Sequence, residues 1–383
     1  LSAPHLAGNE WRYIKECLDT NWVSSVGSFV DRFERMVADY VGAKYAIAVV
    51  NGTSALHIAL LLAGVKPDDE VIVSSLTFVA PVNAIRYAGA WPVFMDADPK
   101  SWQMDPAKVV DFLSNECLWK NGALYNKLTG RRVRAVLPVH ILGSVVDVDP
   151  ILELAGKFDL RIIEDATEGL GARHRGRHVG KLGDIACFSF NGNKIITTGG
   201  GGMIVTDSES WARRAKYLTT QAKDDPIEYI HNEIGYNYRL TNVLAALGVA
   251  QFEQIGQFLE KKRQIADVYD KAFSGFAGVE IMPKSPWVDQ TYWLYTVLLQ
   301  CGTDLRTRKE VVARLNHEGI GSRPLWHPVH ALAPYRDSQS YRIEHTTSIY
   351  DRGICLPCGV SLSAAEQLRS IETFQEIVSS ILP

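Results

Sequence analysis

The chain has 383 residues, of which 46% are hydrophobic and 22% charged, and its formal net charge at pH 7 is -3. This is an ordinary globular composition, and the length is enough for two or three lobes with separate cores. The small negative charge without a clustered Lys/Arg face argues against a nucleic-acid binder, and no apolar run reaches membrane-spanning length, so we expect a cytoplasmic protein with no nucleic-acid or membrane partner.

The first forty residues predict an arm and one helix at 8–19. Short apolar runs then alternate with helical patterns, which favours a mainly parallel sheet covered by helices on both faces. In such sheets ligands bind at the carboxyl ends of the strands. The expected strands are 45–50, 70–74, 91–95, 133–139, 160–164, 185–190 and 202–205, and the expected helices between them are 54–63, 79–88 and 150–158.

The stretch 242–273 is strongly helical, because it lacks proline and its apolar residues recur at three- to four-residue spacing. It leads into a smaller C-terminal part. There, 292–299 and 353–356 are expected to be strands, and 308–318 and 364–382 helices. We therefore expect an arm and large α/β domain over residues 1–245 and a smaller α+β domain over 246–383.

Gly52, Thr53 and Ser54 lie where a predicted strand gives way to a helix. Free backbone N–H groups, the positive end of the helix dipole and two hydroxyls would together make an anion site. An ordinary helix N-cap has the same pattern, so the motif alone leaves phosphate binding and capping open. It is not a Walker loop, because no lysine follows the glycine.

The apolar run 160–164 ends in carboxylates, with Asp165 at the carboxyl end of the predicted strand and Glu168 just beyond. A carboxylate in this position could hold a cationic ring nitrogen or a metal, or Asp165 could simply cap a helix. A metal would need further ligands at suitable spacing, and only His140 and His174 could be invoked, so we expect no metal.

Lys194 follows the strand 185–190, lies among Asn and Gly residues, and precedes four glycines at 199–202. A surface position is the usual alternative for any lysine, but a lysine enclosed in a site can form a Schiff base. Four glycines in a row cost chain entropy, which indicates close backbone approach or a required turn.

A phosphate cradle, a carboxylate and a Schiff-base lysine in this order on an α/β frame are what pyridoxal 5'-phosphate (PLP) needs. The sequence resembles the DegT/DnrJ/EryC/StrS family of PLP-dependent sugar aminotransferases over essentially its whole length. The resemblance implies fold type I, the aspartate aminotransferase-like α/β fold with a mainly parallel seven-stranded sheet. Its landmarks are 51–56, 76–78, 138–140, 164–166, 189–190, Lys194, the glycine run and 235–241.

The resemblance implies roles for these residues. Lys194 would form the Schiff base and move the proton during transfer. Asp165 would contact the pyridine nitrogen, with a low pKa because its partner is a cation. The phosphate would be held by residues of two landmark segments, namely Gly52, Thr53, Ser54 and Ser189.

Four further positions are expected around the ring and the subunit interface. Phe78 would stack on the ring face, or else be a core residue. Glu168 would lie near the phenolic oxygen or the substrate, where many family members carry Gln, or else cap a helix. Asn237 and Arg239 would reach the active site of a partner subunit, with a surface loop as the alternative.

The segment 323–330 is expected to bring Trp326, His327 and His330 to the substrate mouth, although a structural role is equally open. His140 could contact the cofactor or belong to the core. Lys223 and Arg239 are candidates for the diphosphate of a sugar nucleotide. Cys355 and Cys358 have the spacing of a redox or metal pair, but no second Cys/His pair accompanies them, so a structural role is favoured.

Within the family, the stretches 22–27, 188–203 and 218–226 look closest to enzymes that aminate C4 of UDP-4-keto-6-deoxy-N-acetylglucosamine on routes to bacillosamine and legionaminic acid. The resemblance thus implies a nucleotide-linked keto sugar and L-glutamate as substrates, and a homodimer with the active site at the subunit interface. The alternatives are C3 amination of a dTDP-keto sugar and a PLP-dependent sugar dehydratase. Dehydratases on this fold replace the lysine by His, so Lys194 favours transamination.

Overall fold

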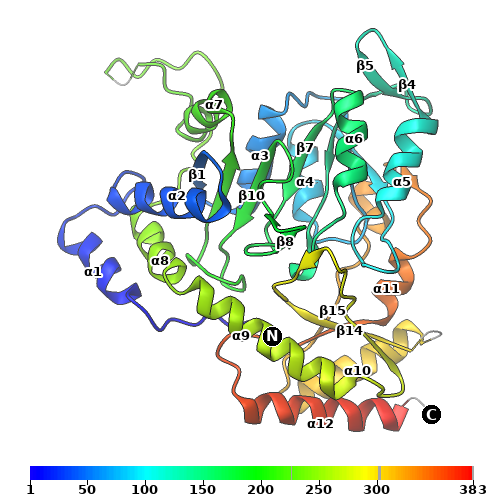
Figure 1. The fold of residues 1–383 in the computed structure, drawn as a ribbon. Helices are drawn as coiled ribbons and strands as arrows, with labels where there is room; N and C mark the ends of the chain where they lie inside the picture. The colour runs from blue at the N-terminus through cyan, green and yellow to red at the C-terminus, as the bar shows by residue number, and fades with distance from the viewer. Residues whose placement is uncertain (226, 301–302, 382–383) are drawn as a thin grey trace.

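The computed structural model describes residues 1–225, 227–300 and 303–381 (Figure 1). Pro226 of the stretch 218–226 and Leu382 of the predicted helix 364–382 lie outside these ranges. Within them, no helix combines the length and the apolar character that crossing a bilayer requires.

All seven strands predicted for the central sheet are present, in the order β1-β11-β10-β7-β6-β2-β3. The run from β10 to β3 is parallel throughout, whereas β11 is antiparallel to both of its neighbours. This confirms the mainly parallel sheet. The bounds are β1 Tyr45–Val49, β2 Glu70–Ser74, β3 Trp91–Met95, β6 Arg132–Leu137, β7 Arg161–Asp165, β10 Ile185–Ser189 and β11 Gly202–Thr206.

The sheet has ten strands, so seven was too few. The hairpin of β4 (Cys117–Lys120) and β5 (Ala123–Asn126) joins it through β6, and β16 (Ser340–Tyr341) pairs with the far edge of β3. The hairpin projects at the top right of Figure 1 and three of the four β4 residues are exposed, so it lacks a buried apolar run. β16 spans two residues, too short for any periodicity.

Helices cover both faces of the sheet, as predicted; α3 packs against α4 and α7, and α6 packs against α5. The first forty residues hold two helices rather than the one predicted. α2 buries Phe29, Phe33 and Val37, which recur at helical spacing. The bounds are α1 Glu10–Asp19, α2 Ser28–Val41, α3 Gly52–Leu62, α4 Ala80–Tyr87, α5 Pro106–Asp111, α6 Asp149–Lys157 and α7 Glu209–Thr219.

The helical stretch 242–273 is two helices, α8 (Asn242–Phe252) and α9 (Ile255–Phe273). α9 runs towards the C-terminal helices at the bottom of Figure 1. The C-terminal part adds the antiparallel sheet β12-β14-β17-β15, which confirms its α+β character. The bounds are α10 Leu305–His317, α11 Thr346–Arg352, α12 Ala364–Ile381, β12 Val279–Ile281, β14 Tyr295–Leu299, β15 Arg323–Pro324 and β17 Gly353–Leu356.

A small three-stranded sheet joins the two parts of the chain, in the order β13-β8-β9. The domain boundary predicted between residues 245 and 246 falls inside α8, and the division into two domains stays a prediction. The bounds of the small sheet are β8 Arg173–His174, β9 Arg177–His178 and β13 Val288–Asp289.

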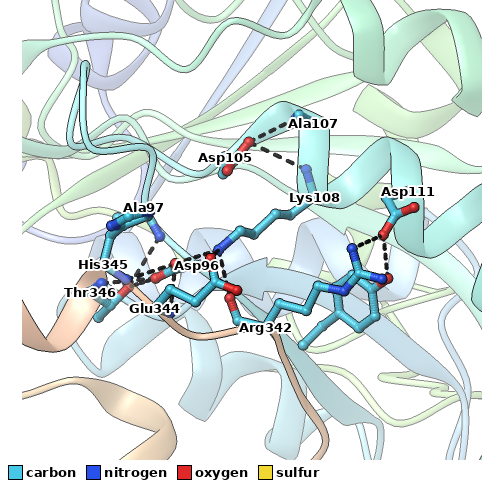
Figure 2. A network of polar contacts seen from close by, with 11 residues as sticks. Asp96, Ala97, Asp105, Ala107, Lys108, Asp111, Arg342, Glu344, His345 and Thr346 are labelled. Carbon is cyan, nitrogen blue, oxygen red and sulfur yellow. Dashed lines mark hydrogen bonds and ion pairs between the residues drawn. The ribbon is translucent and has the colours of Figure 1, made fainter.

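A buried carboxylate just after β3 binds the C-terminal part to the large sheet (Figure 2). Asp96 Oδ1 accepts hydrogen bonds from the backbone N and the hydroxyl of Thr346, at 2.8 and 2.7 Å. Its Oδ2 accepts from the backbone N atoms of Glu344 and His345 and from Lys108 Nζ, the last at 2.7 Å. These donors outweigh burial and hold the pKa of Asp96 at about 2.

We expect Asp96→Ala to lower the free energy of unfolding by about 3–5 kcal/mol, because it leaves three backbone N–H groups and the Thr346 hydroxyl without their acceptor and removes one of the three acceptors of Lys108 Nζ. The pKa of Asp96 lies below its unfolded value, so the stabilisation is present above about pH 4 and is lost as the pH falls towards 2. Urea denaturation between pH 3 and 7 measures both effects. An unfolding free energy equal to wild type at pH 7 would contradict this account.

Candidate active site

A cavity of about 570 Å³ opens at the carboxyl ends of β7 and β10, beside the N-terminus of α3. The C-terminal part closes its other side through 293–294 and 323–326. Eight of the residues predicted for the site line it, namely Gly52, Thr53, Phe78, Asp165, Glu168, Ser189, Lys194 and Trp326.

Strand alternation separates the two carboxylates at the end of β7. Glu164 accepts hydrogen bonds from the backbone N atoms of Gly180, Leu182 and Gly183 at 2.8–2.9 Å, so it fixes that loop. Asp165 is on the opposite face and lines the cavity. Its Oδ1 accepts from the backbone N of Thr167 at 3.1 Å.

Burial raises the pKa of Asp165, although the hydrogen bonds of Thr167 and the charge of Lys194 oppose this. The sequence interpretation expected a low pKa on the premise that a cation is in contact with the carboxylate. The positive charge of the protein's own groups is not enough to offset the effect of burial on the pKa of Asp165. A cationic ring nitrogen in contact with the carboxylate would lower this pKa.

Lys194 lies in the loop between β10 and β11, and its side chain is largely buried. Its Nζ lies 3.7 Å from Glu168 Oε1 and 4.0 Å from the centre of the Trp293 ring. The indole N–H of Trp293 donates to the backbone oxygen of Asn193 at 2.8 Å, so the ring is tied to the loop that carries the lysine. The amine therefore faces one carboxylate and one aromatic surface.

The glycine run serves both purposes expected of it. Gly199 has φ +79°, in the left-handed region that favours glycine. A Cβ on Gly202 would lie 2.5 Å from the backbone of Asn51, so β11 passes directly against the turn that begins α3. The run thus brings the Lys194 loop and the α3 N-terminus into contact.

The N-terminus of α3 forms the phosphate end of the cavity. Asn51 caps the helix, because its side-chain oxygen accepts from the backbone N of Ser54 at 2.7 Å. A Cβ on Gly52 would lie 3.0 Å from the Cβ of Ser189, so the glycine keeps room between these two walls. Thr53 and Ser189 offer their hydroxyls to the cavity.

Glu168 shares this enclosure, and burial raises its pKa to about 7, despite the opposing charge of Lys194. Its Oε2 accepts from the backbone N of Leu142 at 2.9 Å. Leu142 has φ +62°, a conformation that is strained for leucine, so the loop 141–143 is held against this carboxylate. The side chain is thus a fixed acid that titrates near neutrality.

We expect Glu168→Gln to stabilise the cofactor-free protein at pH 8 by about 1–3 kcal/mol, because a pKa raised from 4.5 to about 7 opposes folding once the group must ionise. The carboxyl contributes stability below about pH 4.5 that is lost as the pH rises through 7. Thermal unfolding from pH 5 to 9 measures this. The two proteins should converge at pH 5, and parallel curves would contradict the assignment.

Two predicted cofactor contacts lie outside the cavity wall. Ser54 is buried and its backbone N–H is taken by the cap. Asn237 lies in an isolated bridge with Thr220. His140 does not line the cavity, and its ring lies away from it: Nδ1 accepts from Val146 N and Nε2 donates to the Glu164 carboxylate at 3.2 Å. Its backbone N–H donates to the carbonyl oxygen of Asp165 at 3.0 Å.

Three predicted substrate contacts also lie away from it. Arg239 Nη1 pairs with Glu34 at 2.8 Å and donates to the backbone oxygen of Ala48. His327 Nδ1 lies 3.1 Å from its neighbouring carbonyl, and His330 Nδ1 lies 2.5 Å from the Ser75 hydroxyl. The role of Asn237 and Arg239 in a partner subunit stays a prediction.

The sequence interpretation missed Trp293 and Arg323, which line the cavity from the C-terminal part. Trp293 falls within the predicted strand 292–299, and its ring stacks parallel to that of Trp326, with ring centres 6.2 Å apart. Arg323 was quoted only as the start of the Trp326 segment. It brings a guanidinium to the cavity, where a carboxylate or diphosphate could bind it.

The residues around the cavity fit PLP. Hydroxyls and the N–H groups at the start of α3 suit its phosphate, the buried Asp165 suits a protonated ring nitrogen, and the Lys194 amine suits its aldehyde. Phe78, half exposed on the cavity wall, offers an aromatic face for the ring. The cradle requires Gly52, because a side chain there would meet Ser189 and Thr167.

Comparison with known proteins gives the same result. The model of the DegT/DnrJ/EryC1/StrS aminotransferase family matches residues 4–375. The GDP-perosamine synthases of Caulobacter vibrioides and Escherichia coli O157:H7 are 40% and 38% identical, covering 99% and 98% of this chain and 98% and 97% of their own. The structure of the aminotransferase TlmJ from Streptoalloteichus hindustanus matches with a TM-score of 0.90 at 26% identity, covering 100% of this chain and 99% of its own.

Proposed function

Because the chain belongs to the DegT/DnrJ/EryC1/StrS family of PLP-dependent sugar aminotransferases, we propose that it transfers the amino group of L-glutamate to the 4-keto carbon of a nucleotide-linked 6-deoxyhexose. One observation carries the proposal: Lys194 and Asp165 line one cavity together with Trp293 and Trp326, and the Trp293 ring lies 4.0 Å from Lys194 Nζ. Such aromatic rings suit a sugar ring, and Gly52, Thr53 and Ser189 of the phosphate cradle line the same cavity.

The bound cofactor supplies an electron-accepting ring that carries the amino group between the two substrates. Thr53, Ser189 and the N-terminus of α3 bind its phosphate. Asp165 holds the proton on its ring nitrogen. Lys194 Nζ is the base that takes the proton from Cα of the amino donor, and Trp293 limits the access of water to that amine.

Arg323 is our candidate for the anionic groups of the substrates. Arg323 is exposed and lines the cavity from the C-terminal part. A planar guanidinium binds a carboxylate or a diphosphate by paired hydrogen bonds. It could therefore serve glutamate in one half of the reaction and the sugar nucleotide in the other.

The candidate sugar substrates differ in the nucleotide to which the sugar is linked. The motifs at 22–27, 188–203 and 218–226 favour UDP-4-keto-6-deoxy-N-acetylglucosamine. The relatives at 40% and 38% identity are named GDP-perosamine synthases, which favours a GDP-linked sugar. C3 amination of a dTDP-keto sugar is the third possibility to be tested.

The experiment is a two-stage titration of the purified, PLP-loaded protein. L-Glutamate should bleach the cofactor band near 400 nm (roughly, from the chemistry of lysine-bound cofactor). UDP-, GDP- and dTDP-linked keto sugars are then added separately, and only the true acceptor should restore the band within seconds. Mass spectrometry of the product locates the new amine. If no keto sugar restores the band after glutamate has bleached it, the proposed acceptor class is wrong.

We further propose that the protein works as a homodimer in which Asn237 and Arg239 serve the partner's cavity. Apolar side chains remain exposed on α1 and in the loop after it, such as Trp11, Trp22 and Val26, which would suit a second copy. Mixing inactive Lys194→Ala subunits with impaired Asn237→Ala subunits should restore activity, because each hybrid would contain one intact site. A monomer in sedimentation, or mixing without recovery, would refute the shared site.

A further inference from the structure

Lys262 is buried behind the active site without contacting it. Its side chain is 1% exposed, and its Nζ donates to the backbone oxygens of Trp293 and Cys358, at 2.9 and 2.8 Å. The third group around the nitrogen is the sulfur of Cys358, at 3.6 Å. All three contacts are carbonyl oxygens or a thiol, and burial lowers the pKa of the lysine.

Burying a lysine among uncharged groups is costly, and an apolar side chain of similar length would fill the same space. Lys262 instead fixes the relative positions of three segments, because its side chain joins α9 to Trp293, two residues before β14, and to Cys358, just after β17. The Cys358 thiol also donates to the Trp293 oxygen, at 3.4 Å. Two donors therefore fix the backbone of a single residue.

That residue is the aromatic neighbour of the catalytic lysine. The Trp293 ring lies 4.0 Å from Lys194 Nζ, and its N–H holds the backbone of Asn193. On the other side, a Cβ on Gly143 would lie 2.5 Å from the Trp293 backbone N, so the loop that contacts Glu168 also packs directly against Trp293. A shift of this backbone would move a wall of the cavity relative to the lysine.

We propose that Lys262 is a positioning residue, which acts through the backbone of Trp293 to hold the indole ring against Lys194. The inference rests on the role of Lys194 in binding the cofactor and does not depend on which sugar is aminated. The mostly apolar segment 293–299 requires such an anchor, because Trp293 precedes β14 and has no strand pairing to fix it.

The test uses the rate at which the cofactor-free protein takes up PLP at Lys194, followed near 400 nm (roughly), and the visible circular dichroism of the loaded protein. Lys262→Met should slow uptake about tenfold or more and weaken the dichroic band, because misplacement by about 1 Å has large kinetic effects. Arg263→Met is the matched control. Arg263 is the next residue of α9 and donates to the backbone oxygen of Gln290, so its loss should leave both readouts unchanged.

A double-mutant cycle tests the route through Trp293. Lys262→Met and Trp293→Phe should each slow uptake, and the double variant should be no slower than the more affected single variant. Multiplying effects would overturn the proposal, as would a Lys262→Met protein that melts earlier yet takes up PLP at the wild-type rate. If Lys262→Met does not fold, an unchanged rate in Trp293→Leu overturns it. Neither PLP uptake nor the circular dichroism involves a sugar. A negative result would therefore contradict the role of Lys262 without bearing on which keto sugar is aminated.

Discussion

Lys194→Ala is expected to abolish transamination, with a fall in kcat of at least about 10⁴-fold, because in the proposed mechanism this residue would both bond the cofactor and move the proton. The purified variant should lack the lysine-bound cofactor band. In wild type, borohydride reduction followed by peptide mass mapping should place the added cofactor mass on the peptide containing Lys194. The same treatment of the variant should leave that peptide unmodified.

Two control variants test whether the loss of activity is due to the loss of the Lys194 amine itself, rather than to the loss of its positive charge or of any lysine. Lys194→Arg keeps a cation opposite Glu168 but cannot bond the aldehyde, so it should be as inactive as the alanine variant. Lys15→Ala removes an exposed lysine that pairs with Asp19 on α1 and should retain wild-type kcat. Full turnover by Lys194→Ala would refute the assignment of the site.

The sequence predicted the strand ends and the order of the motifs, because apolar runs and glycines leave local signals. Strand alternation alone did not show which of Glu164 and Asp165 would face the cavity, because it separates neighbours without saying which face is which; the family resemblance selected Asp165. The sequence also could not show that Asn51 would take the N–H of Ser54. Capping and phosphate binding have the same local pattern, and only the folded turn decides between them.

Contacts between distant segments leave no local signal in the sequence. The pairing of Arg239 with Glu34 is one such contact, because Glu34 lies on a helix that the sequence did not predict, and the role of Arg239 towards the substrate stays a prediction. Trp293 falls in the predicted strand 292–299, but Tyr292 has φ +50° and the strand begins only at Tyr295. The spacing of apolar residues predicts a strand or a helix. It cannot predict that a change of backbone direction before β14 brings the Trp293 ring next to Lys194, which is distant in the sequence.

The second large effect is expected at the two adjacent acids of β7, where one substitution should lower the catalytic rate and the other should lower the stability of the fold. Asp165→Asn is expected to lower kcat at least about 10²-fold, because an amide cannot hold the proton on the ring nitrogen. Its stability without cofactor should equal or exceed that of wild type, since the change removes a buried carboxyl whose pKa burial raises.

Glu164→Gln should do the reverse. Its carboxylate accepts from three backbone N–H groups and His140, and an amide nitrogen facing those donors should cost about 2 kcal/mol or more in unfolding free energy. Any folded fraction should keep its cofactor band, because Glu164 does not face the cavity. Both variants are tested by measuring kcat and the urea midpoint of unfolding. Asp165→Asn should lower kcat but not the midpoint, and Glu164→Gln should lower the midpoint but keep the cofactor band. If Asp165→Asn lost stability and kept its rate, the cavity would have been assigned to the wrong face of the strand.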